Sequence, residues 1–380
     1  MNKKHILHLI TKLPEKYNSK FVSFSEEHLT EYSHTYVTLV SDVGLKSNNG
    51  LADANIIDLN LFGRVAKMKR LISLFLNPQY DLVIFHGLFY KGPFLFFLSC
   101  IFKFTSLPEK SLWMTWGGDI YYFQNRVNNI TGWFNELLRK SMIKKFFFIS
   151  SLLPDEVELI RLNYHARAIH LDAFYPNPAP YEDYSVKLSE KDGENKFSFL
   201  LGNSADPQNN HDYMLRALSH LKGDIKIFCI LSYSIVDKEY VRNIIALGHE
   251  LFDEDFIPLT DFMSIDDYKM FIETIDFACY YHNRQQAMGN IFQFLHMGKS
   301  VFLRQDTLSK LFLHRYGFQI QCSENLADLN TKKLVELKQI DVMNKVNNQK
   351  VIESHFSELA AKAKWSLALE KVFAFIKKSN

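Results

Sequence analysis

The chain has 380 residues, of which 47% are apolar and 23% charged, and its formal net charge at pH 7 is +2. This length exceeds one ordinary hydrophobic core and predicts two domains, while the near-neutral charge excludes a strongly basic nucleic-acid-binding protein. The four cysteines are isolated, without the spacing of a zinc site or a disulfide framework, which favours a reducing cytosol.

The first ten residues, "MNKKHILHLI", have a short apolar run and no small-residue cleavage site, so they predict a first strand rather than a signal peptide. The apolar window "GPFLFFLSCIF" at 92–102 is far shorter than the roughly 20 residues that a membrane-spanning helix needs. We therefore do not expect an integral membrane protein.

Strand-like and helix-like segments alternate along the first half of the chain. Strands are expected within 5–10, 35–41, 80–87, 111–119 and 144–151, helices at 18–32 and 131–141, and a basic amphipathic stretch at 64–76. Such alternation implies parallel strands joined by right-handed crossovers.

The alternation restarts after a linker expected at 176–196, where prolines and charged residues replace apolar periodicity. Strands are expected within 196–204, 225–232, 255–260, 275–281 and 300–304, and helices at 208–221, 237–249, 264–274 and 289–297. We therefore predict an α/β protein with two Rossmann-like domains facing across a cleft. The expected domains are 1–175 and 197–330, followed by C-terminal helices at 331–380 that pack back on the N-terminal domain. Ligands of such sheets bind outside the carboxyl ends of the strands.

Two polar motifs follow expected strands of the first domain. In "VIFHG", His86 could donate to a sugar hydroxyl or phosphate oxygen, and Gly87 would let the backbone approach a ligand; the alternative is a histidine satisfied by backbone. In "WMTWGGD", Gly117 and Gly118 would line the cleft wall together with Gly87, and Asp119 is a candidate general base for an acceptor hydroxyl. The alternative is a type I′ or II′ turn in which Asp119 caps the next helix.

A third motif, "FLLGNSADPQNNH", ends a strand at Gly202 in the second domain. Asn203, Ser204 and Asp206 then precede a helix whose first N–H groups and dipole would form an anion site. Plain capping of that helix by Ser204 or Asp206 explains the motif equally well.

The fourth motif is "HNRQQAMGN", between an expected strand and a helix starting near Gly289. Arg284 can donate two parallel hydrogen bonds to a phosphate, and the helix start adds backbone donors. The alternative is a solvated loop with Arg284 on the surface. Four polar loops at strand ends favour a ligand site over four unrelated loops.

Two other patterns resemble known ligand-binding motifs but do not indicate a ligand site. "GKS" at 298–300 resembles the end of a Walker A loop, but the glycine required five residues earlier is Gln293. "DED" at 253–255 resembles a metal-binding Asp-x-Asp, but it lies in a charged connection and is interpreted as a solvated loop.

The motifs "FHG", "WGGDIY", "LLGNSADPQNNH" and "RQQAMGN", in this order, resemble those of the bacterial 4-acetamido-4,6-dideoxygalactose transferases, which are GT-B glycosyltransferases. The resemblance covers residues 81 to about 305. It implies metal-independent and cofactor-independent transfer from a dTDP-linked sugar to a polyprenyl-diphosphate-linked saccharide of enterobacterial common antigen or O-antigen. It also implies a peripheral enzyme at the cytoplasmic face of the bacterial inner membrane, acting on no nucleic acid.

The same resemblance implies roles for the residues of the four motifs. His86 and Asp119 would be catalytic, and the donor diphosphate and sugar would be bound by Gly202, Asn203, Ser204, Asp206, Arg284, Gln285, Gln286, Gly289 and Asn290. Tyr233 and Gln293 would border the nucleoside. Many GT-B enzymes have glutamates where this chain has Gln285 and Gln293, and neutral amides fit a deoxyribose donor at least as well.

Membrane docking and the exact activity stay open at this point. The basic apolar segments 64–76 and 91–104 are candidates for a bilayer contact, or else core-facing helices with snorkelling lysines. Alternative functions are a GT-B transferase of another nucleotide-deoxysugar, a non-catalytic nucleotide-sugar-binding partner of an envelope assembly complex, and a two-domain nucleotide-sugar epimerase.

Overall fold

The computed structural model describes residues 3–11, 15–39, 54–125, 128–179, 181, 196–232 and 237–379. The chain forms two compact units, one of residues 1–178 with 356–380 and the other of residues 179–355. Most of the linker expected at 176–196 lies outside the described residues. None of the described helices combines the length and apolar character needed to cross a lipid bilayer.

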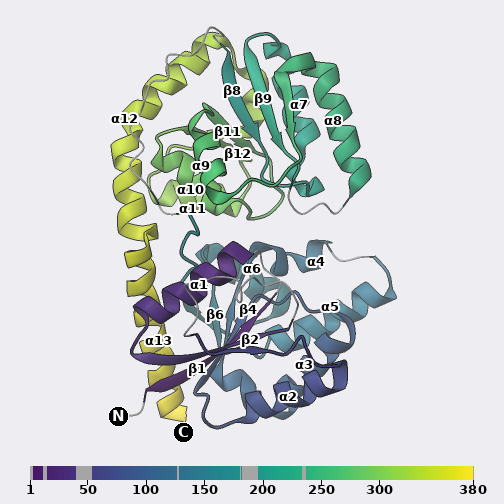
Figure 1. The fold of residues 1–380 in the computed structure, drawn as a ribbon, viewed down its shortest axis with the longest axis vertical. Coiled ribbons are helices and arrows are strands. Elements are labelled where there is room, and N and C mark those ends of the chain that lie inside the picture. Colours follow the sequence, from purple (N-terminus) through teal and green to yellow (C-terminus); the bar gives the residue numbers. More distant parts are fainter. Residues whose placement is uncertain are drawn as a thin grey trace. The chain divides into compact units, whose positions relative to one another are not determined.

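The first unit is built on a parallel sheet with the strand order β3-β2-β1-β4-β5-β6-β7 (Figure 1). Its strands are β1 (Lys4–Ile10), β2 (Tyr32–Thr38), β3 (Ile56–Asp58), β4 (Leu82–His86), β5 (Ser111–Met114), β6 (Phe148–Ser150) and β7 (Ile169–Leu171). Its helices are α1 (Glu15–His28), α2 (Arg64–Leu76), α3 (Gly92–Phe104), α4 (Tyr122–Asn125), α5 (Ile130–Ile143), α6 (Pro154–Tyr164) and α13 (Glu358–Ser379).

Alternation along β1 separates the two faces of this sheet. Leu7 and Leu9 point into a core shared with α2, α3, α5 and α6, because side chains of a strand alternate between the two faces. Ile10 packs with Val22 of α1 on the opposite face, where Trp365 of α13 is also buried at 0% exposure. The sheet is therefore covered on both faces, as parallel sheets are.

The second unit contains a parallel sheet with the order β10-β9-β8-β11-β12-β13. Its strands are β8 (Phe197–Leu201), β9 (Ile225–Ile230), β10 (Phe256–Leu259), β11 (Phe277–Tyr280), β12 (Ser300–Leu303) and β13 (Gln321–Cys322). Its helices are α7 (His211–Leu218), α8 (Lys238–Phe252), α9 (Ile265–Glu273), α10 (Met288–His296), α11 (Leu308–Arg315) and α12 (Thr331–Phe356), the last of which ends at the boundary of the unit. Both sheets are doubly wound, which confirms the predicted α/β fold class.

Several expected elements differ from those observed. The helix expected at 18–32 is α1, which ends at His28 because β2 already begins at Tyr32. The window at 92–104 is helix α3, and the helix expected at 208–221 is divided by short 3₁₀ turns on both sides of α7. Of the two helices after residue 331, α12 belongs to the second unit and α13 to the first.

Helix α13 is attached to the first unit by a buried tryptophan. Trp365 Nε1 donates to the carbonyl oxygen of Phe174 at 2.9 Å, and its ring centroid lies 5.4 Å from that of Phe21 on α1. A buried indole with a satisfied N–H provides much apolar burial and one specific bond.

We predict that Trp365→Ala lowers the free energy of unfolding of the first unit by about 3–5 kcal/mol, because it opens a cavity under α13. All four tryptophans of the chain lie in this unit, so tryptophan fluorescence during denaturant unfolding reports on it alone. Leu367→Ala, on the same helix but 53% exposed, should shift stability by less than about 0.5 kcal/mol. Equal midpoints for the two variants would contradict this role of α13.

Candidate functional site

The strands of the first unit end at one edge, where the predicted motifs follow them. Ile10, His86, Met114 and Ser150 pair in succession across β1, β4, β5 and β6. The loop after β4 turns at Gly87, whose φ of +86° favours glycine, and a Cβ there would lie 2.7 Å from a ring carbon of Phe89. The turn therefore requires a glycine at this position.

Asp119 holds the loops after β4 and β5 together. One carboxylate oxygen accepts from Leu88 N at 2.8 Å and from Trp113 Nε1 at 2.9 Å, and the other accepts from Trp116 N at 2.7 Å. Burial raises the pKa of Asp119, and the hydrogen bonds from Trp116 and Leu88 together with the Arg139 charge oppose that rise. The side chain is only 1% exposed.

These contacts bear on the predicted role of Asp119 as a general base. A base must come within hydrogen-bond reach of the proton that it removes, and this carboxylate is enclosed by three donors of its own unit. The role of Asp119 as a general base stays a prediction, and the enclosure of its carboxylate counts against that role. The type I′ or II′ turn considered for Gly117 and Gly118 is wrong, because Gly117–Asp119 forms a 3₁₀ turn.

Arg139 of α5 forms hydrogen bonds with the same two loops. Its guanidinium donates to the carbonyl oxygens of Leu88 and Asp119 and lies over the ring of Tyr122, with 4.8 Å from its carbon to the ring centroid. The side chain is 3% exposed. Sequence reasoning missed this arginine because its partners are backbone atoms far away in the chain.

His86 is the third member of a buried chain of histidines. His34 Nδ1 lies 2.9 Å from His8 Nε2, and His8 Nδ1 lies 3.0 Å from His86 Nε2. His86 Nδ1 in turn contacts the hydroxyl of Tyr175. At its other end, His34 Nε2 lies 3.2 Å from the carbonyl oxygen of Leu29.

The carbonyl of Leu29 sets the direction of every bond in this chain. Burial lowers the pKa of His34 to about 4 and that of His86 to about 3, and burial also holds the pKa of His8 well below 6.5. Each ring is therefore neutral at pH 7 and carries one N–H. Since a carbonyl only accepts, His34 Nε2 donates, and each following ring must donate through Nε2 and accept at Nδ1.

Tyr175 is consequently the donor at the end of the chain. Both nitrogens of His86 are used within the unit, and the side chain is 0% exposed. Direct contact of His86 with a substrate stays a prediction, and this geometry favours a positioning role. His8, His34 and Tyr175 were not among the residues predicted for the site.

In the second unit, Asn209 joins the loop after β8 to the loop after β11. Its Oδ1 accepts from Asn203 N at 3.0 Å and from His282 Nε2 at 2.9 Å, and its Nδ2 donates to Ser204 Oγ and to the Asp206 carbonyl oxygen. The side chain is 0% exposed. One amide with its hydrogen-bonding capacity used in four directions fixes both loops.

The predicted Gly202 is required by the side chain of His211. Gly202 has a φ of +67°, and a Cβ on it would lie 2.1 Å from His211 Nε2. His211 Nδ1 lies 2.9 Å from the hydroxyl of Tyr240, and burial lowers the pKa of His211 to about 3. The strand end thus packs directly on a neutral imidazole.

Arg284 and Asp206, both predicted for the site, form an ion pair. Arg284 Nη2 lies 3.2 Å from Asp206 Oδ2, its Nε donates to Gln208 Oε1 at 3.1 Å, and its Nη1 donates to the carbonyl oxygen of Gln285 at 3.3 Å. Arg284 is 18% exposed at its side chain. The alternative of a solvated surface arginine is wrong, because three acceptors orient the guanidinium.

Helix α10 begins next to this pair. Ala287 at its N-cap has a φ of +59°, a strained conformation for a residue with a Cβ, and Gly289 and Asn290 of the first turn are partly exposed. Gln286 is 9% exposed, and its Nε2 is buried without a hydrogen-bond partner among the described residues, as is Asn203 Oδ1. Such atoms are rare in folded proteins and call for a ligand or water.

The two residues predicted for the nucleoside side have different outcomes. Tyr233 lies outside the described residues. Gln293 is 3% exposed, and its Nε2 donates to the carbonyl oxygen of Ala179 at 3.0 Å, a bond within the second unit. A nucleoside contact by Gln293 stays a prediction.

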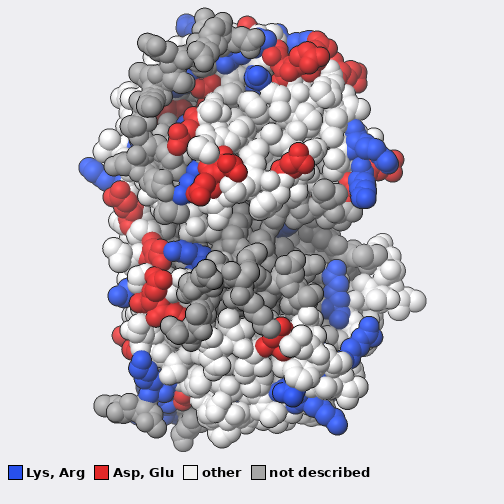
Figure 2. Space-filling model, viewed as in Figure 1, with Lys and Arg blue, Asp and Glu red and all other residues white. Residues whose placement is uncertain are grey.

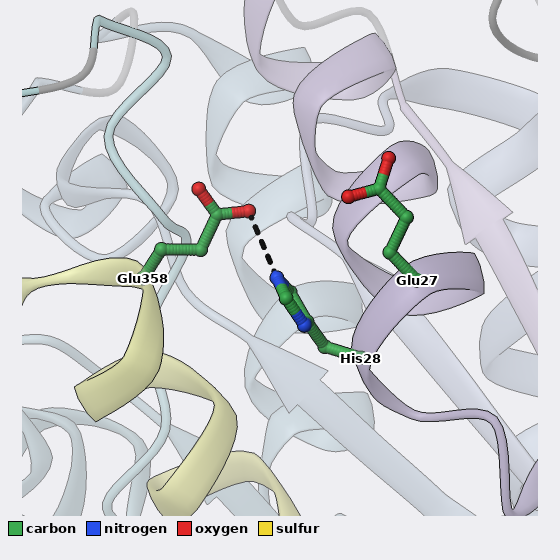
Figure 3. A group of neighbouring side chains, drawn as sticks. All are labelled: Glu27, His28 and Glu358. Atoms are coloured by element: carbon green, nitrogen blue, oxygen red, sulfur yellow. Dashed lines mark ion pairs between the residues drawn. The ribbon is translucent and has the colours of Figure 1, made fainter.

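One group of possible metal ligands occurs among the described residues, formed by Glu27, His28 and Glu358 (Figure 3). Glu358 Oε2 lies 2.6 Å from Lys20 Nζ, and Glu358 Oε1 lies 3.3 Å from His28 Nε2. The ammonium of Lys20 already neutralises the carboxylate, so the group is explained as the contact between α1 and the first turn of α13.

Comparisons with known proteins agree with this architecture. A family model described as "4-alpha-L-fucosyltransferase glycosyl transferase group 56" matches residues 3–373. Among solved structures, Anabaena HepE in complex with UDP and glucose has a TM-score of 0.71 at 11% identity, over 97% of this chain and 100% of that one. Sucrose-phosphate synthase from Thermosynechococcus elongatus has a TM-score of 0.69 at 10% identity, over 98% and 100%. The lipopolysaccharide outer core galactosyltransferase WaaB has a TM-score of 0.61 at 10% identity, over 97% and 99%. At these identities the likeness shows the GT-B fold alone.

We predict that Asp119→Asn destabilises the first unit by about 1–3 kcal/mol, because the amide NH₂ must face at least one buried donor. Asp172→Asn, at a side chain 63% exposed with an ion pair to Lys364, should cost less than about 1 kcal/mol. Denaturant midpoints by tryptophan fluorescence compare the two. An Asp119→Asn variant as stable as the parent would contradict the structural role.

The histidine chain predicts a pH dependence for the first unit. The folded-state pKa of His34, about 4, lies below the value of 6.5 for an unperturbed histidine, so the unfolded state takes up the proton first. The stability that neutral His34 contributes to the first unit is therefore fully present above pH 6.5 and is lost as the pH falls toward 4.

Between pH 7 and pH 5 the free energy of unfolding of His34→Gln should fall by about 2 kcal/mol less than that of the parent, because the variant lacks this buried neutral histidine. His165→Asn, at an exposed left-handed position where asparagine is tolerated, is the control and should keep the parental dependence. Identical pH profiles for the parent and His34→Gln would show that His34 is not held neutral.

Proposed function

The chain belongs to the 4-alpha-L-fucosyltransferase family, glycosyl transferase group 56, and from this premise we propose the reaction that this glycosyltransferase catalyses. It transfers 4-acetamido-4,6-dideoxygalactose from a dTDP-linked donor to a polyprenyl-diphosphate-linked saccharide, without a metal ion. The acceptor belongs to an envelope polysaccharide such as enterobacterial common antigen or O-antigen. The reaction takes place at the cytoplasmic face of the inner membrane.

The observation that carries the proposal is the oriented cation at the carboxyl edge of the second unit. Arg284 is held by Asp206 and Gln208 beside the start of α10. Ligands of doubly wound sheets bind at this edge, and a guanidinium with a fixed fork suits a diphosphate. Asp206 then acts by positioning Arg284 rather than by contacting the donor phosphates.

This arrangement supplies the charge that the reaction needs. When a sugar leaves its nucleoside diphosphate, negative charge develops on the leaving phosphate. Arg284 and the backbone N–H groups of the first turn of α10 stabilise that charge, which is the support for transfer without a metal. Because these donors are fixed before the substrate binds, little reorganisation accompanies the step.

Two buried polar atoms of the loops that carry Asp206 and Arg284 suit a sugar phosphate. Gln286 Nε2 is a donor and Asn203 Oδ1 an acceptor, both without partners among the described residues. Sugars and phosphates offer both acceptors and hydroxyl donors, so one ligand could satisfy both atoms. The Ser204 hydroxyl accepts from Asn209 and keeps its own proton for a phosphate oxygen.

The identity of the donor sugar rests on the family and on the motifs. The family description names a fucosyl group, which is a 6-deoxyhexose like the sugar of the proposed donor. The neutral amides of Gln285 and Gln293 stand where many GT-B enzymes have carboxylates, and they suit the deoxyribose of dTDP at least as well as a ribose.

We predict that Arg284→Ala lowers kcat/KM at least about 100-fold, the usual cost of removing one preorganised donor to developing charge. Arg242→Ala, at an exposed position of α8, should leave turnover unchanged. Circular dichroism establishes that both variants are folded. Parental turnover in folded Arg284→Ala would remove this residue from the donor site.

Transfer itself is measured with labelled sugars and a polyprenyl-diphosphate disaccharide acceptor. We expect product from the dTDP-linked 4-acetamido-4,6-dideoxygalactose, not from UDP-linked or GDP-linked hexoses, and an unchanged rate in excess EDTA. Product from a UDP-linked sugar alone would replace the proposed donor, and complete loss with EDTA would overturn metal independence.

A further inference from the structure

Helix α5 presents its apolar side chains to solvent. Ile130, Trp133, Phe134 and Leu137 are 87%, 58%, 45% and 48% exposed, and their spacing of three and four residues places them on one face of the helix. We call these four residues the α5 stripe. An ordinary surface helix would turn such a stripe toward the core.

The polar side chains of α5 point inward instead and fix this orientation. Asn135 and Arg139 are 6% and 3% exposed. Asn135 Oδ1 accepts from Gly92 N at 2.8 Å, and Arg139 donates to the carbonyl oxygens of Leu88 and Asp119. Turning the α5 stripe inward would break all of these buried bonds, so its exposure is built into the unit.

The helices that share a core with α5 also expose apolar groups. Helix α3 lies beside α5, with Ser99 Oγ 3.3 Å from the Leu138 carbonyl oxygen, and it exposes Phe96 at 51% and Phe104 at 75%. Helix α2 packs on the same core and exposes Val65 at 68% and Leu76 at 54%. The α5 stripe is therefore accompanied by exposed apolar side chains on two helices that pack on the same core.

The charged side chains of this surface have one sign. In α2, α3 and α5 every charged residue that reaches solvent is basic, because Glu136, the one acidic residue of the three helices, is 8% exposed. In Figure 2 the region where Figure 1 places the first turns of α5 is white, and the nearest coloured side chains are blue. The solvent-accessible basic residues are Arg64, Lys67, Lys69, Arg70, Lys103 and Lys140.

We propose that the α5 stripe inserts into the interface of an anionic lipid bilayer, with the basic residues of α2 and α3 on the headgroups. A tryptophan beside phenylalanine and aliphatic groups suits the boundary between headgroups and acyl chains. Lys140 follows Leu137 by one turn, so its ammonium reaches the headgroups while the stripe is immersed. Apolar insertion and basic attraction together give stable peripheral binding, whereas either one alone is weak.

This inference rests on the proposed function in one respect, since a lipid-linked acceptor places the reaction at a bilayer. It also goes beyond the docking segments expected from the sequence, 64–76 and 91–104. The stripe lies on the helix that also carries Arg139, which supports the loops after β4 and β5. Insertion of α5 would hold that edge of the first unit near the lipid surface.

The test is flotation of the purified chain with vesicles of phosphatidylglycerol and phosphatidylethanolamine, compared with vesicles of phosphatidylcholine. The parent should float with the anionic vesicles and lose most of that binding in high salt. The double variant Trp133→Ser with Phe134→Ser should bind at least about tenfold more weakly. The control pair Phe262→Ser with Met270→Ser, at residues 72% and 61% exposed in the second unit, should bind as the parent does.

The membrane contact requires both that the parent floats and that the double variant binds more weakly. A parent that does not float, or a double variant that floats like the parent, would exclude the α5 stripe as a membrane contact. Sedimentation that shows a dimer dispersed by the double variant would assign the stripe to a second copy of the chain.

Transfer assays keep this result separate from the proposed function. The double variant should lose activity toward acceptor embedded in vesicles and keep the parental kcat toward a short-chain acceptor in solution. Flotation without any transfer would overturn the proposed function and leave the docking surface standing. Equal loss toward both acceptors would show that the stripe acts on the fold or the site rather than on the membrane.

Discussion

Each unit fixes the loops at the carboxyl edge of its sheet with one fully buried polar side chain. In the first unit Asp119 accepts hydrogen bonds from the loops after β4 and β5 and from Trp113 of β5. In the second unit Asn209 joins four groups of two loops. Loops of parallel sheets have no ladder to hold them, so such buried bonds decide where their side chains point. The oriented Arg284 depends on this constraint, because its partners Asp206 and Gln208 lie in the loop that Asn209 anchors.

The electrostatics of the two edges differ accordingly. The loops after β8 and β11 of the second unit carry the Arg284 guanidinium, an adjoining helix start and two unpartnered buried polar atoms, a combination that suits an anion. The first unit instead holds neutral histidines, whose direction is set from Leu29 to Tyr175. In this account charge stabilisation belongs to the second unit, and the polar groups of the first unit position its loops.

Much of the fold could be predicted from the sequence, because strands such as β8 and helices such as α10 carry their own periodicity and end signals. The proximity of Asp206 and Arg284 also followed, since both come after strands of one parallel sheet. The hydrogen-bond partners of Asp119 could not be predicted. An aspartate after a strand reads the same in the sequence whether its carboxylate faces solvent or three buried donors. The histidine chain joins residues 26 and 78 positions apart, and the orientation of α5 depends on acceptors in other loops. Neither has a local signal.

The most direct test of the central claim is backbone hydrogen–deuterium exchange of the full chain with and without dTDP, using ADP as a control nucleotide. The account predicts slower exchange with dTDP in residues 202–210 and 282–287, the two loops joined by Asn209, and in the first turn of α10. Protection confined to other parts of the chain, or no protection at saturating dTDP, would contradict a donor site built on Arg284.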